Sequence, residues 1–283
     1  MAIFYNQATL SYGGGTMNSN TTEAELLSGL TLTKTALSSE YNPGGSAVYA
    51  ITLSNIGSTP YNSLTLTDNL GAYDVGGDTF VPLTYVPASL VYYVNGISEP
   101  LPTVTATNPL TISGINLPAE STATLIYEAQ VNEFANMTAG SVITNTATVD
   151  AGVGIGELTA TATLPVGEST NLTIAKAVCP AILTDNENLT YTIIVQNLGN
   201  TPAVATDGVI ISDLFNPALS NITVTLNGTE LQENVGYTYD EATGAFATTN
   251  GTVTVPAATY TQNPDGSFVT NPGVTVLTVT GTV

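Results

Sequence analysis

The second half of the sequence repeats the first, and this repeat limits the folds that the chain can adopt. "LTLTKTALSSEYNPGGSAVYAITLSNIGSTP" (30–60) matches "LTIAKAVCPAILTDNENLTYTIIVQNLGNTP" (172–202). Both copies contain the turn sequence Asn-x-Gly-x-Thr-Pro, which begins at Asn55 in the first copy and at Asn197 in the second. A repeat of this length predicts two domains that share one architecture.

The composition indicates that both domains are built from β-strands. The 283 residues are rich in Thr, Val, Asn, Gly and Pro, which favours strands and turns over helices. Asn-Gly pairs at 95–96 and 227–228 predict tight hairpins at equivalent points of the two copies. We therefore expect an all-β chain, with a first domain at 30–168 and a second at 169–283.

The charge of the chain excludes two classes of partner. The chain has 22 acidic residues and two lysines, which gives a formal net charge of −20. Such a chain repels nucleic acid and anionic membranes, so we expect neither as a partner. The near absence of basic residues also removes most sites for trypsin-like proteases, which suits an extracellular protein. The first residues show no secretion signal, which leaves the export route open.

The composition also argues against an enzyme. The chain has no histidine and a single cysteine, Cys179, so the usual metal sites and nucleophile triads cannot be built. We expect no metal, no cofactor and no catalysis on an external substrate. We interpret Cys179 as a small apolar residue, with an intermolecular disulfide as the alternative.

The second copy of the repeat lacks the last strands of the first. The first copy continues through "NEFANMTAGSVITNTATVD" and "ELTATATL", whereas the second stops at Val283. The N-terminal stretch 3–34 aligns instead with 142–176, which places Asn6 opposite Asn145. We interpret residues 1–29 as a donor strand and linker, and we predict that the second domain lacks its closing strand.

An incomplete sandwich needs another segment to cover its open edge. Strand addition by the N-terminus of another copy would complete it. Because donor and acceptor are different surfaces, this contact propagates into a head-to-tail filament. The alternative is a closed monomer, since a linker of about 16 residues reaches roughly 55 Å when fully extended.

Three kinds of polar residue interrupt the apolar faces of the expected strands. Lys34 and Lys176 are the only basic side chains and occupy equivalent points of the repeat. Alternate residues of a strand share a face, so each lysine is expected to point toward a core. By the same alternation, the other polar residues on apolar faces are Asp68, Asp213, Asn145 and Asn6.

Two interpretations account for such a trio of Lys, Asp and Asn. One is a buried ion pair whose remaining hydrogen bonds are satisfied by the amide. The other is a self-catalysed isopeptide bond, because burial favours a neutral amine and a neutral carboxylic acid. The amine then attacks the Asn side-chain carbonyl while the acid moves protons, and ammonia leaves.

Four motifs in order carry a resemblance to a known family: "TKT", "Y.I...N.G.TP", "LTD" and "NTATV". They resemble the conserved repeat domain of bacterial surface proteins, a domain of unknown function, and are similar to isopeptide-forming domains of Gram-positive fimbrial subunits. The resemblance implies an immunoglobulin-like β-sandwich in which a first-strand Lys is joined to a last-strand Asn beside an acid. It implies Lys34, Asp68 and Asn145 in the first domain, and Lys176, Asp213 and a neighbour's Asn6 in the second.

These observations lead to one hypothesis and one alternative. The hypothesis is a structural, pilus-like subunit of an extracellular filament on a cell or spore surface, with other copies of itself as its partner. Donor-strand complementation would assemble it, and Lys–Asn bonds would lock it, with Asp68 and Asp213 as proton shuttles. The alternative is a repeat module of a surface adhesin that binds a host or carbohydrate ligand.

Overall fold

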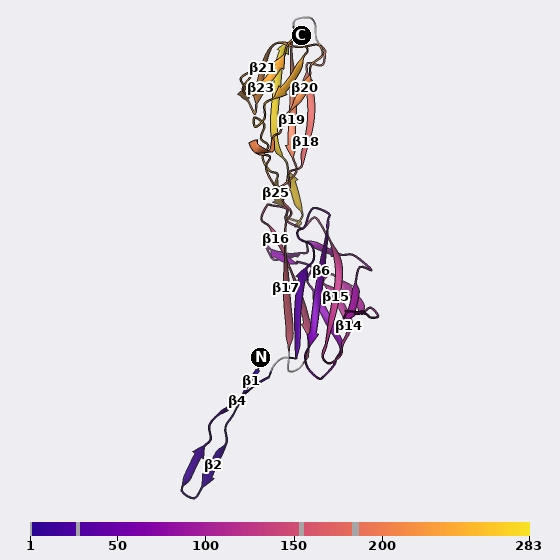
Figure 1. Cartoon of the computed structure of the whole chain (residues 1–283), viewed down its shortest axis with the longest axis vertical. Coiled ribbons are helices and arrows are strands. Elements are labelled where there is room, and N and C mark those ends of the chain that lie inside the picture. Colours follow the sequence, from indigo (N-terminus) through magenta and orange to yellow (C-terminus); the bar gives the residue numbers. More distant parts are fainter. Residues whose placement is uncertain (1, 27–28, 153–155, 183–186) are drawn as a thin grey trace. The chain divides into compact units, whose positions relative to one another are not determined.

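A computed structural model describes residues 2–26, 29–152, 156–182 and 187–283. Within these ranges the chain is built from β-strands, and the helical content is one short 3-10 turn, Ala205–Asp207. The chain forms two compact units, Met1–Asn132 with Ile143–Leu164, and Glu133–Val142 with Pro165–Val283. The predicted all-β class is confirmed (Figure 1).

The N-terminal segment is a two-stranded hairpin. Strand β1 (Ala2–Asn6) pairs with β4 (Thr22–Leu26), and β2 (Thr9–Tyr12) pairs with β3 (Gly15–Asn18), as the indigo strands of Figure 1 show. More than half of the surface of each of four large apolar side chains in this hairpin is exposed: Tyr5, Leu10, Tyr12 and Met17. Two antiparallel strands are marginal in water without an apolar face to pack against.

The first domain is an immunoglobulin-like sandwich of two antiparallel sheets. One sheet has the order β12 (Ile97–Ser98), β11 (Val91–Val94), β15 (Ser121–Val131), β6 (Ser46–Asn55) and β5 (Leu30–Ala36), with β10 (Leu83–Tyr85) also paired to β15. The other has the order β13 (Thr103–Thr107), β14 (Leu110–Leu117), β7 (Tyr61–Asp68), β16 (Val142–Asp150) and β17 (Glu157–Pro165). A small hairpin adds β8 (Tyr73–Val75) and β9 (Asp78–Phe80).

The core of this domain follows the alternation of apolar residues along each strand. In β6, every second side chain is buried, from Ala47 to Asn55, and β15 and β16 show the same pattern. The alternate side chains point to opposite faces of a strand, so one face of each sheet packs inward. The fully buried apolar residues include Tyr49, Ile51, Leu53, Leu66, Leu110, Ile112, Leu125 and Val149.

The second domain repeats the sandwich with fewer strands. Its larger sheet has the order β18 (Leu172–Cys179), β19 (Asn188–Asn197), β27 (Gly273–Thr282), β21 (Ser220–Leu226) and β22 (Thr229–Glu230). The facing sheet comprises β20 (Ser212–Leu214), β24 (Ala245–Thr248) and β23 (Tyr237–Asp240), and a separate hairpin comprises β25 (Thr259–Gln262) and β26 (Phe268–Asn271). Phe215 anchors the core, stacked on Tyr191 with ring centroids 5.0 Å apart.

The repeated turn sequence has the same hydrogen bonds in both domains. The Asn55 amide nitrogen donates to the Thr59 carbonyl at 2.8 Å, and the Asn55 side-chain oxygen accepts from Gly57 N at 3.0 Å. Asn197 makes the matching bonds to Thr201 at 2.7 Å and Gly199 at 2.9 Å. The motif therefore closes the turn through one asparagine side chain, which explains its appearance in both copies.

The two domains differ at one edge of the sandwich. In the first domain β7 lies between β14 and β16, and β17 follows β16. In the described part of the second domain β20 is the outer strand of its sheet, and no strand stands where β16 and β17 stand in the first. All residues of β18 are exposed as a result, including Ile174 at 65%. Lys176 points toward the aromatic core, as expected, but this core is open in the chain by itself and leaves the lysine partly exposed.

Equivalent leucines in β5 and β18 provide a test of this difference. Leu30 is 1% exposed and Leu172 is 37% exposed, although both stand opposite the turn asparagine of the next strand. We expect Leu30→Ala to lower the free energy of unfolding of the first domain by about 2–4 kcal/mol. Leu172→Ala should cost the second domain less than about 1 kcal/mol. Denaturant unfolding of the unassembled chain measures both, and equal losses would contradict an open β18.

Candidate functional site

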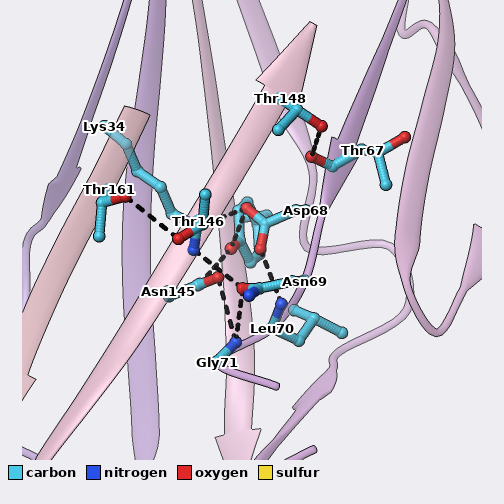
Figure 2. Close-up of polar contacts among 11 residues, drawn as sticks. Lys34, Thr67, Asp68, Asn69, Leu70, Gly71, Asn145, Thr146, Thr148 and Thr161 are labelled. Carbon is cyan, nitrogen blue, oxygen red and sulfur yellow. Dashed lines mark hydrogen bonds and ion pairs between the residues drawn. The ribbon is translucent and has the colours of Figure 1, made fainter. Parts of the chain in front are cut away.

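The first candidate site is a buried ion pair between the two sheets of the first domain. Lys34 Nζ lies 2.6 Å from Asp68 Oδ2, and neither side chain is exposed to solvent. Lys34 comes from β5 and Asp68 from the end of β7, so facing sheets supply the two charges. Figure 2 shows Lys34, Asp68 and Asn145 converging on one point between these strands. The prediction that Lys34 and Asp68 occupy inward positions is confirmed.

Burial changes the acidity of this lysine. Loss of solvent lowers the pKa of Lys34 from 10.5 to about 8, although the Asp68 carboxylate acts in the opposite direction. The Nζ atom also lies 5.0 Å from the centroid of the Tyr49 ring. A pKa near neutrality gives the amine a reactive neutral fraction that a solvated lysine lacks.

Asn145 joins the same network through a tyrosine. The Tyr127 hydroxyl donates to Asp68 Oδ2 at 2.7 Å and accepts from Asn145 Nδ2 at 2.9 Å. Asn145 and Tyr127 are both fully buried. No motif of the sequence points to Tyr127. The signal that distinguishes it is its place directly opposite Tyr49 in the pairing of β15 with β6, which depends on strand register.

The loop after β7 aims two backbone N–H groups at the polar atoms of this site. Leu70 N donates to Asp68 Oδ1 at 3.0 Å, and Gly71 N donates to Asn145 Oδ1 at 3.2 Å. Both residues have positive φ, 53° and 76°. A Cβ atom on Gly71 would lie 2.6 Å from Cγ2 of Ile143. Glycine is therefore required where the backbone approaches the amide oxygen of Asn145.

The first site thus contains the groups that amide formation requires. It holds an amine with a lowered pKa, a carboxylate 2.6 Å from that amine, and a carboxamide whose oxygen accepts a backbone N–H. Such an N–H stabilises negative charge on the oxygen when a nucleophile adds to the carbonyl carbon. Exclusion of solvent strengthens each of these interactions.

The second candidate site has the same pair in a more open setting. Lys176 Nζ forms an ion pair with Asp213 Oδ2, while 38% of the lysine side chain and 17% of the aspartate side chain remain exposed. The Nζ atom lies 4.1 Å from the Tyr191 centroid and 5.2 Å from the Phe215 centroid. Aromatic faces and a carboxylate hold this ammonium group in place.

The remaining predicted residue, Asn6, lies at the end of β1 in the N-terminal hairpin. It pairs with Thr22, whose hydroxyl donates to the Asn6 carbonyl at 3.1 Å, and its side chain is exposed. Of the six predicted residues, the structure brings together the trio of the first domain and the lysine–aspartate pair of the second. Cys179 is a free, exposed residue at the end of β18.

The described ranges lack two kinds of feature. They contain no group of three or more His, Cys, Asp or Glu side chains that could hold a metal ion. They also contain no helix that is long and apolar enough to span a membrane.

Comparison with known proteins found similarity at the level of structure only. No protein-family model and no curated protein matches the chain. The major pilin subunit BcpA of Bacillus cereus is 15% identical over 95% of this chain and 73% of its own, with a TM-score of 0.37. The pilus backbone RRGB of Streptococcus pneumoniae is 11% identical over 86% of this chain and 55% of its own, with a TM-score of 0.34.

A collagen-binding subdomain of the Enterococcus faecalis surface protein ACE is 8% identical over 49% of this chain and 99% of its own, with a TM-score of 0.32. These solved structures belong to the same classes of surface protein that the sequence motifs resemble. At such identities and TM-scores the similarity supports no conclusion about function.

The lowered pKa of Lys34 predicts how stability depends on pH when the lysine is free. Between about pH 8 and the unfolded value of 10.5, the unfolded chain holds a proton on Lys34 that the folded chain has released. Stability therefore rises with pH in this window, by at most about 1.4 kcal/mol per pH unit. Buried tyrosines with raised pKa values oppose this rise only above about pH 10.

Denaturant unfolding of an Asn145→Ala chain, in which Lys34 stays free, measures this slope. The matched control also carries Lys34→Met and Asp68→Leu, an apolar replacement that buried ion pairs often tolerate. We expect the rise to disappear in the control. A flat or falling stability in the Asn145→Ala chain would contradict a lowered pKa of Lys34.

Proposed function

We propose that this protein is the structural subunit of an extracellular, pilus-like filament on a cell or spore surface. The observation that carries the proposal is the difference between two otherwise repeated domains: β16 and β17 complete the first, and the second is open at the same edge. Residues 1–29 serve as donor segment and linker, 30–168 form the first domain, and 169–283 form the second. The chain binds other copies of itself, and neither nucleic acid nor a membrane is its partner.

The open edge of the second domain has the chemistry of a strand acceptor. Strand β20 is the outer strand of its sheet, so one row of its backbone groups is available for pairing. The facing strand β18 presents apolar side chains that are 37–65% exposed: Leu172, Ile174 and Val178. An added strand beside β20 would cover this apolar surface, which is the usual driving force for strand addition.

The N-terminal hairpin has the properties of the missing piece. It aligns in sequence with β16 and β17, and Asn6 aligns with Asn145. In the first domain the hydroxyls of Thr146 and Thr161 are 3.1 Å apart, which joins β16 to β17 beside Asn145. In the hairpin, Asn6 of β1 stands opposite Thr22 of β4. The donor is therefore the whole hairpin, with β4 in the role of β17, rather than a single strand.

Insertion of the hairpin would also create the conditions for a covalent lock. Lys34 and Asp68 are completely shielded in the closed first domain, whereas Lys176 and Asp213 are partly solvated. A donor hairpin from another copy would remove that solvent and supply Asn6. The Lys176–Asn6 bond would then form only after assembly, while the Lys34–Asn145 bond forms inside each chain. Asp68 and Asp213 act as proton shuttles in these two reactions.

Removal of the hairpin tests donor complementation. We expect a chain that lacks residues 2–26 to stay monomeric, because the acceptor edge then has no donor, while the intact chain polymerises. Light scattering and electron microscopy of both chains measure assembly. Polymers formed by the shortened chain would contradict the proposal. An intact chain that is monomeric but carries an internal Lys176–Asn6 bond would show the closed monomer instead.

Replacement of the aligned asparagine tests the covalent lock separately. Asn6→Ala should still assemble, because backbone pairing and apolar burial remain, but its polymers should dissociate in hot detergent. Asn20→Ala, in the same hairpin but not aligned with Asn145, is the matched control and should keep a detergent-resistant ladder. An Asn6→Ala polymer that survives boiling would rule out the Lys176–Asn6 bond.

Intact mass distinguishes the filament from the second candidate function. Each isopeptide bond releases one ammonia. A chain with unmodified mass would leave Lys34, Asp68 and Asn145 as a buried polar network and Lys176 and Asp213 as a partly solvated ion pair. A monomer of unmodified mass that binds glycans or host proteins through its loops would favour the adhesin module.

A further inference from the structure

Tyr127 stands between the carboxylate and the leaving group of the first site. Its hydroxyl contacts Asp68 Oδ2 at 2.7 Å and Asn145 Nδ2 at 2.9 Å. Its ring stacks on Tyr49 with centroids 5.7 Å apart, and the side chain is fully buried. The hydroxyl is thereby fixed within hydrogen-bond reach of both groups, which is the geometric requirement for a general acid.

We propose that Tyr127 is a catalytic residue of the first domain, and that it relays a proton from Asp68 to the departing nitrogen of Asn145. The proposal rests on the proposed Lys34–Asn145 bond and assigns a fourth member to its site.

The reaction balances without any other reactant. Lys34 first gives one proton to Asp68, and the neutral Nζ adds to Cγ of Asn145, placing negative charge on Oδ1 beside Gly71 N. The nitrogen Nδ2 is no longer conjugated and becomes basic. Nδ2 takes the hydroxyl proton of Tyr127, and Asp68 then gives its proton to the Tyr127 oxygen.

The Cγ–Nδ2 bond then breaks and ammonia leaves. The second Nζ proton passes to Asp68 as the amide forms. The starting ammonium and carboxylate have zero net charge, and so do the products: an amide, ammonia and a protonated Asp68.

The contacts favour this route for the proton. Asp68 Oδ2 accepts from both Lys34 and Tyr127, and Tyr127 accepts from Asn145, so the hydroxyl links the acid to the leaving nitrogen. Burial and the adjacent Asp68 raise the pKa of Tyr127 well above its usual value. The hydroxyl therefore keeps its proton until Nδ2 becomes basic.

The second domain shows that the fold does not require this tyrosine. In the first domain, Tyr127 of β15 stands opposite Tyr49 of β6. In the second domain, Tyr191 of β19 is the equivalent of Tyr49, and the residue opposite it in β27 is Val279. Val279 is also fully buried, so an aliphatic side chain fills this place in the same architecture. The hydroxyl in the first domain therefore has a local role beside Asp68 and Asn145.

Tyr127→Phe in the full chain tests the relay. The linked Lys34–Asn145 peptide is followed by mass spectrometry against time after cell-free synthesis, with circular dichroism to confirm folding. We expect bond formation to slow by roughly 10²-fold to 10⁴-fold, the usual contribution of a positioned acid. Tyr92→Phe is the matched control. The Tyr92 hydroxyl donates to the Asn116 carbonyl at 2.6 Å and takes no part in the network of Lys34 and Asp68. The substitution should leave the rate unchanged.

Three outcomes overturn the relay. A folded Tyr127→Phe chain that forms the bond at the wild-type rate reduces Tyr127 to a packing residue. A wild-type chain without the linked peptide removes the Lys34–Asn145 bond and the relay together. If Tyr127→Phe does not fold, 3-fluorotyrosine can be placed at position 127, where it keeps the shape of the side chain and changes the acidity of its hydroxyl. An unchanged rate of bond formation in that chain is the third outcome that overturns the relay. A rate that changes with fluorination at 127 but not at 92 supports the relay.

Discussion

The ion pair between Lys34 and Asp68 sets the demands that the rest of the first domain meets. Two charges without solvent cost several kcal/mol each unless their hydrogen bonds are satisfied. Asp68 accordingly accepts from Lys34, from Tyr127 and from the backbone of Leu70. Lys34 and Tyr127 come from one sheet, Asp68 ends a strand of the facing sheet, and Leu70 lies in the loop after that strand. The pair therefore fixes how the sheets face each other as well as what lies between them.

The second domain contains the same charges but does not enclose them. Lys176 has the same strand register as Lys34, opposite Ile193 where Lys34 stands opposite Ile51. Its surroundings differ because β20 ends its sheet, and solvent still reaches the pair. One sequence unit, used twice, thus gives a closed polar network and an open one. The difference depends on two strands rather than on the residues of the pair.

Much of the fold and part of the site could be predicted from local sequence pattern. Alternation placed Lys34, Asp68 and Asn145 on inward faces, and the Asn-Gly pairs gave hairpins with positive φ at Asn95 and Asn227. Tyr127 could not be predicted in the same way, because its role depends on which residues two strands bring opposite each other. Alternation alone did not indicate how exposed β18 is, because an inward face is buried only when a second sheet covers the strand.

The positions of Lys34 and Asn145 along the chain have a mechanical consequence. Lys34 lies in the first strand of its sandwich and Asn145 in the last strand but one, so nearly the whole domain lies between them. Tension applied at the two ends of the chain would enter and leave the first domain close to these residues. With a covalent bond between them, the load would pass from β5 to β16 through side chains. The strands between the two residues would carry no force, so tension could not pull them apart.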